Sequence, residues 1–217
     1  MTLRTLLEEI RRDGVRDERV LEALARVPRE RFVPSSHRGL AHGNHPLPIA
    51  CEQTISQPTI VAMMTELAEL QPGDRVLEVG TGSGYQTAVL AEMLGLGAAQ
   101  DETVEDAGSE LVSLEILPEL ASGAGTLLKE LGYRGLDLRL ADGHRGCPER
   151  APFDAIVVTA APARLPMALA DQLAERGRLV IPVGVEHQEL LVITKIDGAT
   201  RERRVIPVRF VPMTGES

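Results

Sequence analysis

Residues 75–85 read RVLEVGTGSGY, in which an apolar run is followed by glycines at alternate positions, Gly80, Gly82 and Gly84. A helical pattern of apolar residues follows, so the stretch predicts a strand that turns directly into a helix. Glycines at such a turn allow a ligand to approach bare backbone at the N-terminus of the helix. The spacing does not match the dinucleotide motif GxGxxG, because that motif requires glycine at position 85, where this chain has Tyr85.

The remaining pattern is E-x-G-x-G-x-G. This form resembles the nucleoside-binding turn of S-adenosylmethionine-dependent methyltransferases, in which no pyrophosphate has to be held. The resemblance implies that the turn contacts S-adenosylmethionine as the cofactor. The candidate cofactor-binding residues of the turn are Glu78, Gly80, Gly82, Ser83 and Gly84.

Strand and helix patterns alternate after the turn, which is typical of a parallel sheet with helices on both faces. The pattern predicts strands at 75–79, 111–115, 136–141, 153–159 and 178–182, and helices at 85–94, 118–131 and 165–174. Two more strands, at 189–195 and 204–211, are separated by a turn containing Asp197 and Gly198, which predicts an antiparallel hairpin.

Three helical patterns precede the glycine turn, and an irregular segment at 28–49 with several Pro and Gly residues interrupts them. The sequence therefore predicts an α/β fold. Its core is a doubly wound, mostly parallel sheet of the Rossmann-like methyltransferase type, with a C-terminal antiparallel hairpin and extra N-terminal helices. We expect one domain, in which residues 1–70 form the N-terminal helices and substrate loop and residues 71–217 form the cofactor-binding core.

Acidic residues end two of the predicted strands. In a doubly wound sheet, ligands bind at the carboxyl ends of the strands. Glu115 ends the second strand, where a carboxylate can accept hydrogen bonds from ribose hydroxyls, although a solvated strand-end charge is the alternative. Asp142 and Gly143 end the third strand, where an acceptor and a free N–H suit an adenine edge, although Asp-Gly is also an ordinary turn.

Composition limits the class of protein. The chain has 217 residues and is 43% hydrophobic, enough for a substantial core, and its net charge is -9. Such a charge argues against a general basic field for nucleic acid or anionic membranes. Without a long apolar run or a signal-peptide pattern, we expect a cytoplasmic protein. Cys51 and Cys147 are too few for a disulfide framework and lack metal-site spacing, so we expect no metal.

The group that receives the methyl is indicated by what the sequence lacks. Methyltransferases that act on amides and bases commonly carry an Asn/Asp-Pro-Pro-aromatic tetrapeptide after the fourth strand, whereas this chain has TAAP at 159–162. No histidine stands out as a base. A carboxylate needs none, because its pKa is near 4 and it is already ionised at neutral pH. Methyl transfer to a carboxylate requires mainly alignment and exclusion of water.

The segment at 46–58 reads PLPIACEQTISQP. Ser56 suits the N-cap of the third helix, with Pro58 in the first turn. Free amides and a hydroxyl would then face one point and attract a carboxylate. Capping alone is the alternative role of Ser56.

The chain as a whole resembles the protein-L-isoaspartate (D-aspartate) O-methyltransferase family. The segments that carry the resemblance are RFVP at 31–34, PLPI at 46–49, QTISQP at 53–58, IVAMMTEL at 60–67, VLEVGTGSGYQTA at 76–88, DG at 142–143, APFDAI at 151–156, GRLVIPVG at 177–184 and VRFVP at 208–212. They extend across nearly the whole chain.

By this resemblance Ser56 is the active-site serine. Ser83, Glu115, Asp142 and Gly143 contact the cofactor, and Thr214, just after the last motif, approaches it. The family methylates the abnormal carboxylate of isoaspartyl or D-aspartyl residues in aged proteins. The ester then collapses to a succinimide, whose hydrolysis restores some normal aspartate. Damaged peptides and proteins are thus the expected partners of a chain that we expect to be a monomer.

The chain departs from the family pattern in three places. Ala50 and Glu52 stand where the family usually has glycines, and His42 stands where it commonly has Tyr. The connection at 95–110 is longer than usual and acidic, which predicts an exposed insertion. The altered turn at 50–52 leaves an alternative open, namely a related methyltransferase dedicated to an aspartate in one peptide or protein partner.

Overall fold

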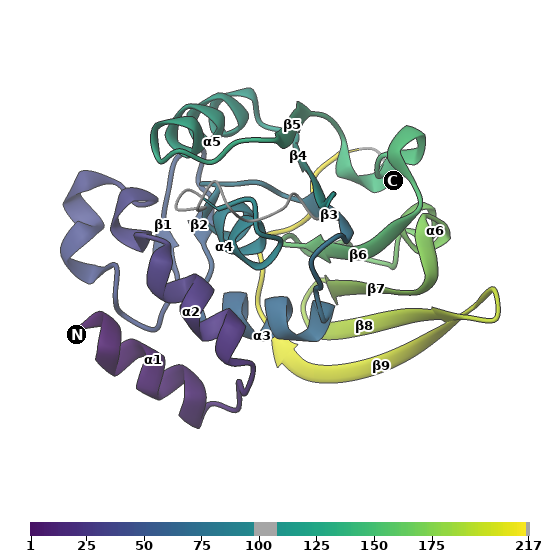
Figure 1. Cartoon of the computed structure of the whole chain (residues 1–217), viewed down its shortest axis with the longest axis horizontal. Helices are drawn as coiled ribbons and strands as arrows, with labels where there is room; N and C mark the ends of the chain where they lie inside the picture. The colour runs from purple at the N-terminus through teal and green to yellow at the C-terminus, as the bar shows by residue number, and fades with distance from the viewer. Residues whose placement is uncertain (98–107, 216–217) are drawn as a thin grey trace.

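The computed structural model describes residues 1–97 and 108–215, and within them a seven-stranded sheet forms the centre of the molecule (Figure 1). The strand order is β5-β4-β3-β6-β7-β8-β9. The strands are β3 (Arg75–Val79), β4 (Glu110–Glu115), β5 (Leu136–Leu140), β6 (Phe153–Val158), β7 (Leu173–Val183), β8 (Gln188–Ile196) and β9 (Ala199–Val208). Strands β3 to β7 pair in parallel, and β7, β8 and β9 pair antiparallel. The predicted sheet and C-terminal hairpin are therefore confirmed.

Six α-helices are described, with short 3-10 helices and a small hairpin between them. The α-helices are α1 (Leu3–Arg12), α2 (Glu18–Arg26), α3 (Pro58–Ala68), α4 (Tyr85–Met93), α5 (Pro118–Glu130) and α6 (Met167–Asp171). The 3-10 helices are η1 (Arg29–Arg31), η2 (Ser35–Leu40), η3 (Gly143–Arg145) and η4 (Pro148–Arg150), and the hairpin consists of β1 (Leu47–Pro48) and β2 (Thr54–Ile55). The acidic insertion expected at 95–110 lies mostly outside the described residues.

Strand β3 lies in the middle of the sheet, and its side chains point alternately to the two faces. Val76 lies opposite Leu111 of β4 and Ala155 of β6, and these three side chains join one buried cluster with α2, α3 and α4. Leu77 points the other way, into a second cluster that contains α6. Both faces of the sheet are thus covered, as in a doubly wound fold.

Two strands begin earlier along the chain than predicted. The predicted helix at 165–174 shrinks to α6 because Leu173 already pairs with Phe153, so β7 begins there and not at 178. Strand β9 begins at Ala199 and not at 204, because it pairs with β8 directly after the turn. Its first residues are charged and exposed, so the sequence gives no apolar alternation there.

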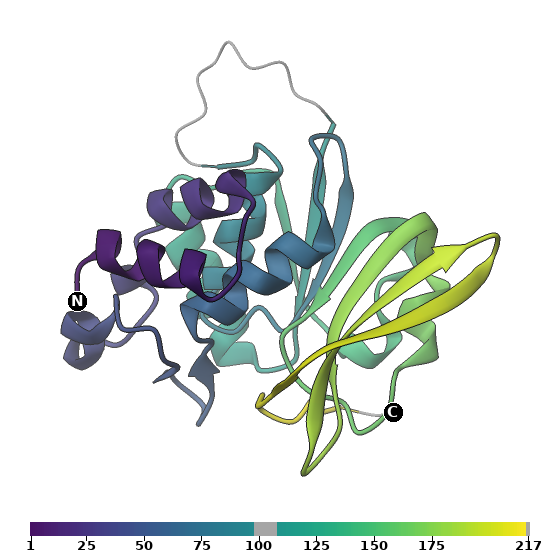
Figure 2. The same ribbon diagram turned by 90° about the horizontal axis from the view of Figure 1, so that it is seen from below.

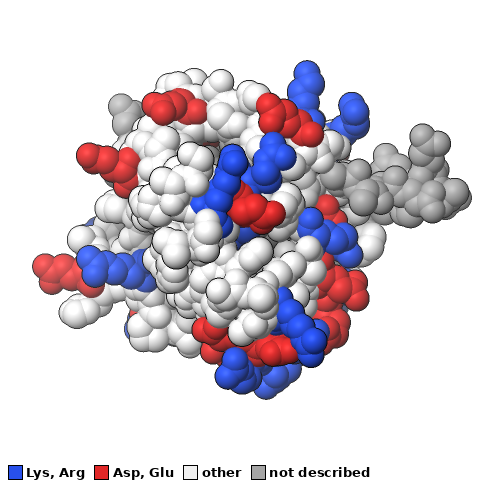
Figure 3. Space-filling model, turned by 90° about the vertical axis from the view of Figure 1, so that its left-hand side faces the viewer, with Lys and Arg blue, Asp and Glu red and all other residues white. Residues whose placement is uncertain are grey.

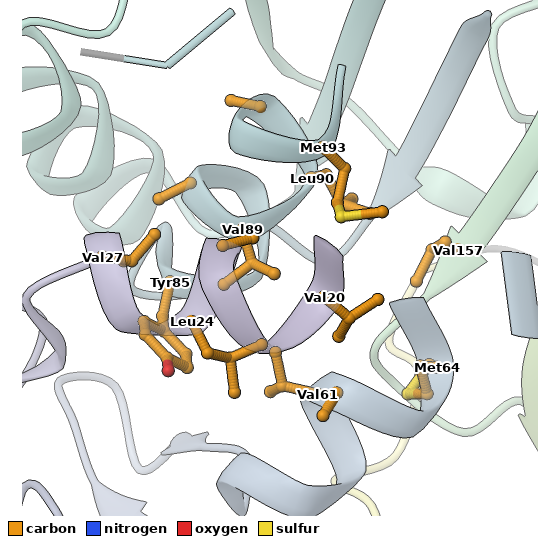
Figure 4. Close-up of a cluster of buried hydrophobic side chains, with 14 of the residues drawn as sticks. Val20, Leu24, Val27, Val61, Met64, Tyr85, Val89, Leu90, Met93 and Val157 are labelled. Atoms are coloured by element: carbon orange, nitrogen blue, oxygen red, sulfur yellow. The ribbon is translucent and has the colours of Figure 1, made fainter. Parts of the chain in front are cut away.

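The N-terminal helices lie over α3 and α4 and not directly on the strands (Figure 2). Figure 4 shows Val20 and Leu24 of α2 beside Val61 of α3 and Tyr85 of α4. All four side chains are at most 3% exposed. Residues 1–70 and the central sheet therefore share one hydrophobic cluster.

Glu78 is an ionisable side chain at the centre of the fold, and it is completely buried. One carboxylate oxygen accepts hydrogen bonds from Thr87 Oγ1 of α4 at 2.5 Å and from Ser113 Oγ of β4 at 2.6 Å. Ser113 Oγ lies 2.6 Å from Thr81 Oγ1 in the glycine turn. The network joins β3, β4, the turn and α4. Burial raises the pKa of Glu78 to about 8, although the two hydroxyls oppose the shift.

We predict that Leu24→Ala lowers the free energy of unfolding by about 2–5 kcal/mol, because a buried leucine leaves a cavity. Because the cluster is shared, unfolding should stay a single transition when urea titrations are followed by far-UV circular dichroism and by tyrosine fluorescence. Two separate transitions would show that residues 1–70 fold independently. Leu40→Ala is the matched control, because Leu40 is 51% exposed and should change stability by at most about 0.5 kcal/mol.

Glu78→Gln should remove a pH dependence of stability. A raised pKa in the folded state means that Glu78 favours folding below its ordinary pKa of 4.5, and that this contribution is lost as the pH rises toward 8. Glutamine does not ionise, so the stability of the variant relative to the parent should increase between pH 5 and pH 8.5. Urea unfolding of both proteins across this range measures the difference, in which the titration of other groups cancels. A constant difference would contradict an uncharged, buried Glu78.

Candidate active site

The glycine turn between β3 and α4 is held too close to its neighbours to carry a side chain at Gly80. This residue has φ +99°, and a Cβ there would overlap Thr159 Oγ1. Thr159, at the end of β6, donates to the Gly80 carbonyl at 2.5 Å, and the Gly80 N–H donates to the Leu114 carbonyl at 2.8 Å. The carboxyl ends of β3, β4 and β6 are thereby joined at one point.

Glu115 ends β4 beside this turn, as predicted, and it is 6% exposed. Its Oε2 accepts from the Gly82 N–H at 2.8 Å, and its Oε1 accepts from the N–H groups of Ile116 and Leu117 at 2.9 and 3.0 Å. An ionised carboxylate has about four acceptor positions. One position therefore remains, on Oε2, for a hydroxyl of a ligand.

Asp142 and Gly143 follow β5. The Asp142 side chain caps η3 by accepting from the His144 N–H at 3.0 Å, and it also lies 3.1 Å from His144 Nδ1. A Cβ on Gly143 would overlap Val79 and would lie 3.2 Å from Met213 Cε. The close approach explains why glycine follows Asp142.

The C-terminal tail crosses the ends of the strands. Ala161 and Pro212 form a parallel bridge, in which the Ala161 N–H donates to the Val211 carbonyl and the Met213 N–H donates to the Ala161 carbonyl, both at 2.8 Å. The bridge brings Thr214 to the glycine turn. It also brings Gly215 against the carboxylate of Asp142, where a Cβ would lie 2.5 Å from Oδ1.

These elements surround an open cavity at the carboxyl ends of the strands. The predicted site residues that line it are Ser56, Gly80, Gly82, Ser83, Glu115, Gly143 and Thr214. Three others are placed next to it and do not line it: Glu78 lies beneath the turn, Gly84 begins α4, and Asp142 lies under the tail. Which residues contact a cofactor remains a prediction.

A second cavity adjoins the first. It is lined by residues of β2, the start of α3 and the segment after β9. The two cavities share Thr54, Ser56, Thr159 and Val211. Ser56 therefore lies at their junction.

Ser56 is not the N-cap of α3, and this part of the prediction is wrong. The helix begins at Pro58, so Gln57 takes the cap position, and the Thr59 N–H is satisfied by Asn44 Oδ1 at 3.1 Å. The Ser56 hydroxyl makes no hydrogen bond to any of the residues that the structure describes. It is thus available to a ligand at the junction.

The hairpin formed by β1 and β2 closes one side of the first cavity. Ile49 lies against Gly82, and the turn of the hairpin contains Cys51 and Glu52 with φ 56° and 57°. A left-handed conformation favours glycine, so Cys51 and Glu52 adopt a backbone conformation that is unfavourable for their side chains. Glu52 is exposed and lines neither cavity, so its charge does not face the site.

Several residues of the site were not predicted. Ile116, Leu117 and Leu120 form an apolar wall, and Tyr85 and Thr159 lie among the other lining residues. Thr159, Ile116 and Leu117 each follow a strand at the ligand-binding edge, which is the one sequence signal that these residues carried. The apolar residues resemble ordinary core positions in the sequence.

Charges of both signs are interspersed on the face of the molecule shown in Figure 3. His42 is one of the three places where the sequence departs from the family pattern, and its Nε2 atom lies 3.7 Å from Oε2 of Glu30. Residues 1–97 and 108–215 contain no group of three His, Cys, Asp or Glu side chains placed to hold a metal ion. None of the helices described is long and apolar enough to cross a bilayer.

Comparisons with known proteins agree with the geometry. The profile of the protein-L-isoaspartate (D-aspartate) O-methyltransferase family matches residues 1–217. Protein-L-isoaspartate O-methyltransferase of Gloeobacter violaceus is 52% identical over 211 residues, 96% of each chain, and the enzyme of Aeropyrum pernix is 45% identical over 97% of this chain and 78% of its own.

Among solved structures, a putative protein-L-isoaspartate O-methyltransferase from Plasmodium falciparum, in complex with S-adenosyl-L-homocysteine, superposes with a TM-score of 0.83. It is 28% identical, and the match covers 97% of both chains. The predicted family and methyltransferase fold are confirmed. The chain belongs to the protein-L-isoaspartate (D-aspartate) O-methyltransferase family.

Proposed function

We propose that this chain transfers the methyl group of S-adenosylmethionine to the carboxylate of L-isoaspartyl and D-aspartyl residues, and that transfer takes place at Ser56. The observation that carries the proposal is the junction of the two cavities. The first has the backbone turn and strand-end acid that suit a nucleoside. The second is bordered by β2, the start of α3 and the chain around the end of β9, and we propose that it holds a peptide. Ser56 lies where a cofactor in one would meet a carboxylate in the other.

The first cavity fits the cofactor on two grounds. Gly80 and Gly82 have no side chains, so a ligand can approach the backbone closely at these two positions. Oε2 of Glu115 keeps one acceptor position directed to a cavity that it lines, which suits a ribose hydroxyl. We propose that Ser83, Gly143 and Thr214 complete the contacts, and that Glu78, Gly84 and Asp142 position the turn and the strand ends around them.

The chemistry demands little acid–base catalysis. When bound, S-adenosylmethionine supplies an electrophilic methyl group, which a carboxylate oxygen attacks as the carbon–sulfur bond breaks and its electron pair stays on sulfur. The carboxylate is already ionised at neutral pH, so no residue has to remove a proton. The Ser56 hydroxyl donates to the oxygen that does not react. The apolar wall formed by Ile116, Leu117 and Leu120 excludes water.

The second cavity is where we propose that the substrates of the enzyme bind. We propose that they are peptides and flexible segments of proteins that contain isoaspartyl residues, and that the enzyme acts as a cytoplasmic monomer that does not bind nucleic acid. The net charge of -9 and the interspersed charges in Figure 3 support the last point. The methyl ester collapses to a succinimide, and this begins repair.

The proposal predicts methyl transfer to an isoaspartyl peptide and not to its normal aspartyl twin. Ser56→Ala should lower the rate with the isoaspartyl peptide by roughly 10- to 150-fold, because a charge-assisted hydrogen bond of about 1.5–3 kcal/mol is lost. Affinity for S-adenosylhomocysteine should not change. Ser56 caps no helix, so the melting temperature should also stay constant.

Ser36→Ala is the matched control, because Ser36 lies on η2 and its hydroxyl contacts His37 at 3.0 Å. An undiminished rate for Ser56→Ala would remove Ser56 from the active site. Equal methylation of the isoaspartyl and aspartyl peptides would refute the repair function. A rate confined to one aspartyl sequence would favour an enzyme dedicated to one partner.

Glu115→Gln should weaken binding of S-adenosylhomocysteine by about 10-fold or more, because the charge that accepts the ribose hydroxyl is lost. Titration calorimetry measures the affinity. The matched control is Glu110→Gln at the opposite end of β4, where Glu110 pairs with Arg150 at 3.1 Å. Unchanged affinity in Glu115→Gln, or an equal loss in both variants, would contradict the proposed position of the nucleoside.

A further inference from the structure

Arg29 is the large side chain that lies directly behind Ser56. It belongs to η1 and is 2% exposed. No carboxylate among the described residues forms an ion pair with it. A guanidinium remains protonated at all ordinary pH values, so the fold buries a positive charge without a negative partner. Such a charge is costly unless other groups stabilise it.

Backbone carbonyls and an aromatic ring provide that stabilisation. Arg29 donates to the carbonyls of Ala41 at 2.5 Å, His45 at 3.3 Å and Ser56 at 2.9 Å. Its guanidinium carbon lies 5.5 Å from the centre of the Tyr85 ring, in a cation–π geometry. These contacts spread the charge over neutral dipoles and leave Nε without a partner. The net charge of the cluster remains positive.

The contact with Ser56 fixes the direction of one peptide group. In a trans peptide the C=O and the N–H point in opposite directions. Because the Ser56 carbonyl points to Arg29, the N–H of Gln57 points away from it. This N–H donates to none of the described residues. Gln57 and Ser56 both line the second cavity.

We propose that Arg29 is a positioning residue for the substrate carboxylate: it orients and polarises the Ser56–Gln57 peptide so that the Gln57 N–H and the Ser56 hydroxyl bind the anionic carboxylate together. A donor to the carbonyl strengthens the N–H of the same peptide, because hydrogen bonds in a chain polarise one another. The inference rests on the proposed function and adds a source of charge selectivity to it.

The arrangement also bears on turnover. The substrate is an anion before methyl transfer and a neutral ester after it. The attraction between the buried guanidinium and the carboxylate therefore ends with the reaction, which favours release of the product. An ion pair with a resident carboxylate of the protein would cancel this effect.

The test compares two peptides, one with an isoaspartyl residue and a twin in which the free carboxylate is a carboxamide. Fluorescence anisotropy measures their Kd values in the presence of S-adenosylhomocysteine, and the ratio of the two reports charge selectivity. Arg29→Gln still donates hydrogen bonds but has no charge, so the ratio should fall by about 10-fold or more. Arg29→Lys keeps the charge and should retain most of the ratio.

Arg31→Gln is the matched control, because Arg31 is exposed and pairs with Glu130 at 3.3 Å. Its ratio should equal that of the parent. If Arg29→Gln weakens both peptides equally, Arg29 only holds the loops together and the inference is overturned. A parent enzyme that does not methylate the isoaspartyl peptide would instead refute the proposed function.

A second measurement needs no substitution at Arg29, in case its variants do not fold. In the parent protein, the amide proton of Gln57 should move further downfield in the NMR spectrum with the isoaspartyl peptide than with its carboxamide twin. Equal shifts would overturn the proposal.

Discussion

The backbone between Val79 and α4 passes so close to its neighbours at Gly80 and at Gly84 that a side chain at either position would displace them. Gly80 meets Thr159, and a Cβ on Gly84 would lie 3.2–3.3 Å from α5. The turn is also fixed from below by the buried carboxylate of Glu78 and its two hydroxyl donors. Glu115 accepts from the Gly82 N–H of this turn, and the C-terminal tail pairs with Ala161, two residues after Thr159. A cavity with a backbone wall is the result.

The site combines two buried ionisable groups with different roles. Glu78 lies beneath the turn, where burial keeps it uncharged up to a pH of about 8. Arg29 cannot lose its charge and is stabilised by carbonyls and by Tyr85. The cofactor pocket is thus supported by a neutral network, whereas a permanent cation lies behind Ser56. This asymmetry suits an enzyme whose substrate loses a negative charge during the reaction.

Most of the fold could be predicted from the sequence, because the strands of the parallel core are apolar and the glycine turn marks the first of them. The early start of β9 could not, since its charged residues face solvent on an edge strand. The prediction that Ser56 caps α3 is wrong, because the helix begins at Pro58 and Gln57 takes the cap position. The active-site role of Ser56 stays a prediction. Arg29 carried no signal at all. Its function depends on carbonyls 12 to 27 residues away in the chain, which no local pattern can reveal.

The central claim is that a cofactor and a carboxylate meet at Ser56 from two adjoining cavities. A crystal structure with S-adenosylhomocysteine and an isoaspartyl peptide tests it most directly. The account predicts the nucleoside between the glycine turn and Glu115, the peptide in the second cavity, and the carboxylate within hydrogen-bonding distance of Ser56 Oγ and the Gln57 N–H. A carboxylate bound elsewhere, with Ser56 facing only solvent, would contradict it.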